Sequence, residues 1–134
     1  MSRLDALGMT AEVRGRRVTA RDLVASTLAR IRARDTELNC FTAVIAESAM
    51  RQAEAVDADI GAGKVVGPLA GVPFAVKNLF DVAGLTTLAG SKINAERPRA
   101  VTDATVVARL RGAGAVLVGA LNMDEYAFGF TTEN

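Results

Sequence analysis

The sequence predicts an α/β fold in which helices cover a mixed sheet. Half of the 134 residues are apolar and no long polar tract interrupts them, which suits one globular unit rather than two domains. Helix-like and strand-like segments alternate along the chain, and the segment from residue 74 to residue 116 has the strand–helix–strand form of a crossover between neighbouring parallel strands. These observations together favour a single α/β unit.

The first helix is predicted over residues 20–34. Thr19 and Asp22 form a capping box before it, and the apolar residues beyond them recur at helical spacing with arginines on the other side. Residues 41–45 form a short β-branched and aromatic run that is typical of a strand. Residues 46–60 are rich in alanine, glutamate and glutamine, which predicts a second helix.

The next strand carries the first candidate for chemistry. Residues 67–73 are dense in turn formers, and the apolar run 74–76 that follows is typical of a buried strand. Lys77 and Asn78 come directly after this run. They therefore lie at the carboxyl end of a strand, where α/β sheets usually place their functional groups.

The last part of the chain completes the crossover. Residues 84–91 form a loop of small residues, and a third helix is predicted to begin at Thr102 and Asp103 and to stop at Gly112 and Gly114. Residues 115–121 then form a strand. The chain ends within an apolar stretch at residues 130–134 with no closing helix, so we expect a unit that is cut short.

Composition excludes several classes of function. Lysine and arginine total 16 against 15 acidic residues, which leaves no electrostatic footprint for nucleic acid or an anionic membrane. The four arginines at positions 14, 16, 17 and 21 are interpreted as a solvated face or helix flank. No apolar stretch has the length of a signal peptide or a membrane span, so a cytoplasmic protein is expected.

The chain has one cysteine, Cys40, and no histidine. An internal disulfide and a structural zinc site are excluded on these counts, and no metal or cofactor is expected. Ser-His-Asp and Cys-His mechanisms are excluded as well, because both need an imidazole. Lysine is therefore the natural candidate for a base in any hydrolytic reaction.

Five stretches in order resemble the amidase signature family: GPLAGVPFAVKN at 67–78, GLTTLAGS at 84–91, DATVVARLR at 103–111, GAGAVLVG at 112–119 and NMDEYAFG at 122–129. The resemblance implies a single incomplete amidase domain over residues 1–134. In it, residues 1–66 supply N-terminal helices and the first strand, and residues 67–134 begin the signature core. The residues of these stretches are most similar to those of the carboxybiuret hydrolase branch, whose members act on small urea-like amides with a small accessory subunit. The glutaminase subunit of tRNA-dependent amidotransferase, which shares the NMDE run, is the next most similar.

The resemblance implies amide hydrolysis by a serine, a second serine on a cis peptide bond, and a lysine at the position of Lys77. A lysine acts as a base only when burial draws its pKa from about 10.4 toward neutrality, and the apolar run 74–76 offers such a setting. The alternative is a lysine that ends a strand and reaches solvent. Asn78 either holds the following loop or forms a hydrogen bond near the lysine, and a role in starting a turn is an equal alternative.

The two serines of the family lie in a Gly/Ser-rich stretch downstream, and nothing like it occurs here. None of the four serines, Ser2, Ser26, Ser48 and Ser91, is a credible substitute; Ser91 is expected to cap the next turn. The resemblance places Met123 near the substrate cavity, although a core position is an equal alternative. Asp124 and Glu125 are interpreted as a solvated face or a helix start rather than as a metal or acid–base pair.

Three functions remain open. The first is the N-terminal fragment of an amidohydrolase for a small amide or urea-like substrate, inactive alone because only its lysine is present. The second is a glutaminase subunit, and the third is a non-catalytic binding or assembly module. The implied partners are a small-molecule amide and either a small accessory subunit or a second copy of the chain, with no nucleic acid and no membrane.

Overall fold

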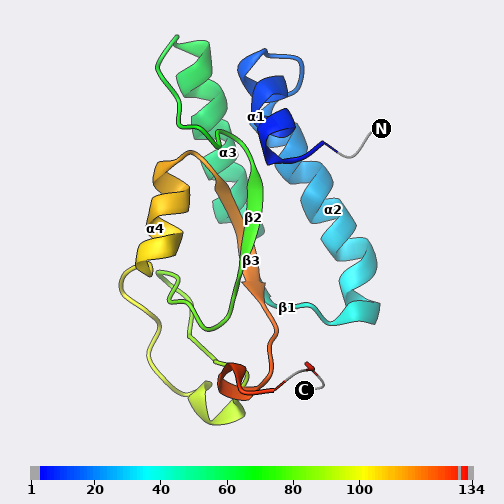
Figure 1. Ribbon diagram of the computed structural model, residues 1–134, viewed down its shortest axis with the longest axis vertical. Helices are drawn as coiled ribbons and strands as arrows, with labels where there is room; N and C mark the ends of the chain where they lie inside the picture. Colours follow the sequence, from blue (N-terminus) through cyan, green and yellow to red (C-terminus); the bar gives the residue numbers. More distant parts are fainter. Residues whose placement is uncertain (1–3, 130, 133–134) are drawn as a thin grey trace.

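The computed structural model describes residues 4–129 and 131–132. Its elements follow one another in the order α1 (Ala6–Arg14), α2 (Ala20–Leu38), β1 (Phe41–Val44), α3 (Ala46–Gly61), β2 (Pro73–Lys77), η1 (Lys92–Asn94), α4 (Thr105–Gly112), β3 (Val116–Leu121) and η2 (Glu125–Ala127) (Figure 1). Ser2 and the predicted open end of the chain at residues 130, 133 and 134 lie outside the described residues.

The three strands form one mixed sheet in the order β1-β3-β2. β3 pairs antiparallel with β1 and parallel with β2, so the predicted mixed sheet and the predicted crossover through α4 are both confirmed. Gly119 of β3 pairs with Val44 of β1 and lies close to the backbone of Ala43. A Cβ there would lie 2.3 Å from the carbonyl oxygen of Ala43, so the close approach of the two strands requires glycine.

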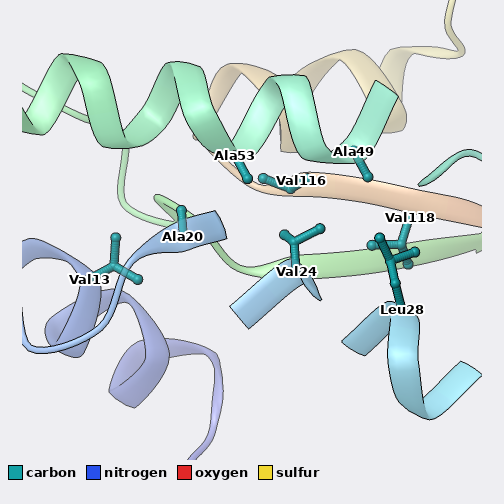
Figure 2. Close-up of a cluster of buried hydrophobic side chains, with 8 residues drawn as sticks. All are labelled: Val13, Ala20, Val24, Leu28, Ala49, Ala53, Val116 and Val118. Atoms are coloured by element: carbon teal, nitrogen blue, oxygen red, sulfur yellow. The ribbon is translucent and has the colours of Figure 1, made fainter. Parts of the chain in front are cut away.

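Helices cover both faces of the sheet because the side chains of β3 alternate between them. Val116 and Val118 point to one face, where they pack with buried residues of α1, α2 and α3 (Figure 2). Leu117 points to the other face and packs with Val107 of α4 and Val76 of β2. A central strand buried on both faces explains why the sequence of β3 is an unbroken apolar run.

Two predicted boundaries move for local reasons. α2 continues to Leu38 instead of residue 34 and ends where Asn39 adopts a left-handed conformation with φ of 49°. α4 begins at Thr105 instead of at Thr102 and Asp103. The Asp103 carboxylate does not cap that helix, because it accepts a hydrogen bond from the Ala83 N–H and pairs with the Arg111 guanidinium at 2.8 Å.

Helix α1 was not predicted. Its N-cap is Asp5, whose carboxylate accepts a hydrogen bond from the Gly8 N–H at 2.7 Å. The arginines around its end are exposed, as expected. They also fasten the helix, because Arg14 donates to the carbonyls of residues 66 and 67 and Arg16 donates to the carbonyl of Ile60.

Across the described part of the chain, we find no helix with both the length and the apolar character needed to cross a membrane.

Candidate active site

The candidate site is the edge of the sheet where the parallel strands β2 and β3 both end. Lys77, the last residue of β2, lies opposite Leu121, the last residue of β3. The residues that follow β3 are therefore brought next to Lys77. The closest charged contact joins Lys77 Nζ to Asp124 Oδ1 at 3.6 Å.

Lys77 is less buried than its apolar strand predicts. Its side chain is 44% exposed, whereas the preceding Val76 is buried. Alternation along the strand accounts for the difference, since Val76 packs under α4 and its neighbour Lys77 points the other way. The expected burial of Lys77 is therefore wrong for the described residues, and its placement at the strand end is confirmed.

Asp124 is the charged partner that the sequence interpretation missed. It is the N-cap of η2, so the predicted helix start is confirmed, but it is buried rather than solvated, unlike the exposed Glu125. The backbone N–H of Gly129 donates to its Oδ2 and lowers the pKa of the carboxyl; burial opposes this effect, and the Lys77 ammonium adds to it. Asp124 is therefore ionised at neutral pH.

Asn78 holds the loop that follows β2. Its side chain is 3% exposed and bonded at both ends: its Nδ2 donates to Thr42 Oγ1 of β1 at 2.7 Å, and its Oδ1 accepts from the Leu88 N–H at 3.0 Å. Its backbone joins β3 and the loop as well, through Leu121 and Ala89. The structure thus shows Asn78 holding the loop, and it also places Asn78 in the turn closed by the Phe80 N–H and the Lys77 carbonyl.

The loop also packs directly against the edge of the site. Gly90, with φ of +70°, lies so close to residues 123 and 124 that a Cβ would come within 2.6 Å of both carbonyl oxygens. Asn94, which is 1% exposed, donates to the Leu88 carbonyl and to the hydroxyl of Tyr126. No signal in the sequence pointed to this Asn94–Tyr126 contact, because it depends on how the loop folds back.

The remaining candidates are placed as follows. Met123 is fully buried, so the core interpretation fits its position, and its role near a substrate stays a prediction. Ser91 begins η1 but its hydroxyl makes no capping hydrogen bond. Ser26 and Ser48 are bonded within α2 and α3, and in the described chain none of these serines has a hydrogen bond to Lys77.

Of the hollows near β1, two have Asn39 in their walls. One, of about 470 Å³, adjoins the site edge and is lined by residues 38–40, Leu121, Asn122 and Thr132. The other, of about 590 Å³, lies between α2 and the β1–α3 connection, with Leu28, Ile31 and Val44 in its wall. Within the described ranges, no group of three or more histidine, cysteine, aspartate or glutamate side chains gathers as a metal site.

Comparison with known proteins identifies the relatives of this arrangement. The amidase family model matches residues 22–134. AtzE, the 1-carboxybiuret hydrolase subunit of Pseudomonas sp. (strain ADP), is 56% identical over 118 residues, which are 88% of this chain and 26% of that protein. A glutamyl-tRNA(Gln) amidotransferase subunit of Rhodopirellula baltica is 51% identical over 116 residues, 87% of this chain and 23% of that protein.

Solved structures agree with these matches. A chain from the structure of a vestigial protein complex, described as revealing the evolutionary origins of an s-triazine catabolic enzyme, superposes with a TM-score of 0.95 at 50% identity; the match covers 98% of this chain and 29% of that chain. A bacterial aryl acylamidase of the amidase signature family superposes with a TM-score of 0.91 at 30% identity; the match covers 98% of this chain and 27% of that chain. The chain thus spans about a quarter of the length of these relatives, and its three-stranded sheet corresponds to a part of their fold.

Proposed function

This chain belongs to the amidase family, and on that premise we propose that it supplies the lysine base of an amidohydrolase with a Ser-cisSer-Lys mechanism. The observation that carries the proposal is the place of Lys77: it ends the strand β2, at the edge where the residues after β3 gather beside it. Catalytic groups of α/β proteins commonly occupy this edge.

In the proposed reaction, the remainder of the amidase fold covers the Lys77 side chain, and its amine form takes a proton from the bridging serine, which deprotonates the nucleophilic serine as it attacks the amide carbonyl. The proton returns to the leaving nitrogen, so that an amine or ammonia departs and an acyl-serine remains. Water then hydrolyses the acyl-serine to a carboxylic acid. Both serines and the oxyanion hole are contributed by the Gly/Ser-rich stretch of the family, which this sequence does not contain, so the 134-residue chain is inactive by itself.

We propose a small amide or urea-like molecule as the substrate. Support comes from the greater identity to the 1-carboxybiuret hydrolase subunit, 56% against 51% for the amidotransferase relative over nearly the same share of the chain. Because a solved relative at 50% identity was described in a protein complex, an accessory subunit is the proposed partner. The glutaminase reaction is the second candidate, supported by the amidotransferase matches.

The test uses a full-length amidase that carries this segment, either natural or made by placing residues 1–134 into the Pseudomonas relative. Lys77→Ala is expected to lower kcat/KM for a ureido amide by about 100-fold or more, the usual contribution of a general base. Lys92→Ala is the matched control, because Lys92 is an exposed lysine at the start of η1 and its loss should leave the rate unchanged.

Hydrolysis by the folded Lys77→Ala enzyme at close to the original rate would show that Lys77 is not the base. Measuring the parent enzyme with glutamine and with the ureido amide separates the two substrate classes. A clear preference for glutamine would favour the amidotransferase function.

A further inference from the structure

The two side chains of the Lys77–Asp124 ion pair differ in their exposure to solvent. The Lys77 side chain is 44% exposed and emerges from the end of an edge strand, whereas the Asp124 side chain is 12% exposed. A long lysine side chain in such a position has many conformations in water. Asp124 is the partner that selects one of them.

Asp124 itself is held rigidly. Its Oδ2 accepts from the Gly129 N–H, which leaves Oδ1 directed at Lys77 Nζ, 3.6 Å away. Its backbone is pressed against Gly90, whose lack of a side chain permits contact with the Asp124 carbonyl. The carboxylate is thus fixed from two sides before any substrate is bound.

Other charged or titratable groups near this edge are engaged elsewhere or face solvent. The Asp81 carboxylate accepts from Thr87 Oγ1, and the Tyr126 hydroxyl bonds to Asn94. Glu125 and Lys92 are exposed. In the described ranges, the ion pair recorded for Lys77 is the one with Asp124.

We propose that Asp124 is a positioning residue for Lys77, which holds the lysine amine at the carboxyl edge of β2 and β3 and compensates the positive charge that the amine gains during the reaction. This inference rests on the proposed function of Lys77 as the base. When Lys77 Nζ takes the serine proton, the ammonium forms beside a carboxylate that is already in place, and no reorganisation is needed at that moment.

The experiment measures kcat and KM from pH 5 to pH 10 in the full-length amidase that carries this segment, with Asp124→Asn against Glu125→Gln. Asparagine keeps an oxygen for the Gly129 N–H and removes the charge. We expect kcat at its pH optimum to fall about 10-fold with little change in KM. Glu125→Gln removes the same charge from the adjacent exposed residue and should leave both unchanged.

Asp124→Glu retains the carboxylate but places it one methylene further along the side chain, so its kcat is expected to lie between those of Asp124→Asn and the parent enzyme. If Asp124→Asn does not fold, judged by circular dichroism, this variant decides: a folded Asp124→Glu enzyme with the parent kcat overturns the proposal. A folded Asp124→Asn enzyme with the parent kcat overturns it too. If Lys77→Ala is inactive in that case, the role of Lys77 as the base stands and only the role of Asp124 is refuted. If Lys77→Ala is active, the proposed function is refuted as well.

Discussion

Asn78 connects three parts of the site through one side chain. It is buried next to Lys77, and it links β1 through Thr42 and the loop through Leu88. Thr42 in turn donates to the Ala120 carbonyl of β3. The position of the residue after the lysine is therefore fixed by hydrogen bonds rather than by apolar packing.

Asn78→Ala is expected to destabilise the fold by about 2–3 kcal/mol, because it leaves the Leu88 N–H and the Thr42 hydroxyl without their partner in a buried site. Urea unfolding measures the change. Ser26→Ala, at an exposed position of α2, should change stability by less than about 0.5 kcal/mol. Equal, small effects for both variants would show that the Asn78 network contributes little.

For individual residues, the sequence predicted the positions that carry a local signal and missed the positions whose environment depends on contacts between distant segments. Lys77 could be placed because an apolar run and a recognisable motif precede it. Asp124 was interpreted as part of a solvated face or a helix start because adjacent residues point in different directions, whereas its contacts depend on the Gly129 N–H and on the parallel register of β3 with β2. A register is a property of two strands, so no single segment reveals it.

The loop between β2 and α4 is held against the site by close backbone contact at Gly90. Gly90 and Gly63 have nearly the same backbone conformation, with φ of +70° and +71°. Their surroundings differ, because a Cβ at Gly63 would meet no atom within 4 Å and one at Gly90 would meet two carbonyl oxygens at 2.6 Å. Substituting each glycine in turn therefore separates the cost of backbone strain from the cost of steric contact.

Gly63→Ala is expected to cost about 1 kcal/mol, the strain of a left-handed alanine. Gly90→Ala is expected to cost about 1–3 kcal/mol beyond that, because the loop must move away from residues 123 and 124. Thermal unfolding of both variants under identical conditions measures the difference. Equal losses would mean that the loop does not press on the edge of the site.

Elements with strong local signals were predicted well. The Thr19 cap is confirmed by its hydrogen bond from the Asp22 N–H, and β3 was recognised by its apolar run. The short helix α1 escaped because its apolar face is small, although Asp5 before it is an N-cap signal. The start of α4 was misplaced because Asp103, a good cap by type, is used in contacts across the fold.

In the part of the chain that the structure describes, the sheet has two open edges. β1 and β2 each pair with β3 alone in the described part of the chain. Several apolar side chains are also exposed, among them Ile93 at 76%, Val101 at 91% and Phe128 at 95%. Open strand edges and exposed apolar groups favour association with other chains.

The purified 134-residue chain is therefore expected to bind a hydrophobic fluorescent dye and to unfold over a broad temperature range. The full-length amidase that carries the same segment is the control and should unfold sharply without binding the dye. A sharp transition of the 134-residue chain, with no dye bound, would instead support the stand-alone binding module.

The strand order has a consequence for how the protein folds during its synthesis on the ribosome. β1 and β2 precede β3 in the chain, yet both hydrogen-bond to β3 and not to each other. Helices α2 and α3 can pair early, but both outer strands must wait for residues 116–121 to emerge, on the order of seconds after their own synthesis. During that interval the nascent chain displays two unpaired strands, and a chaperone has its best opportunity to bind.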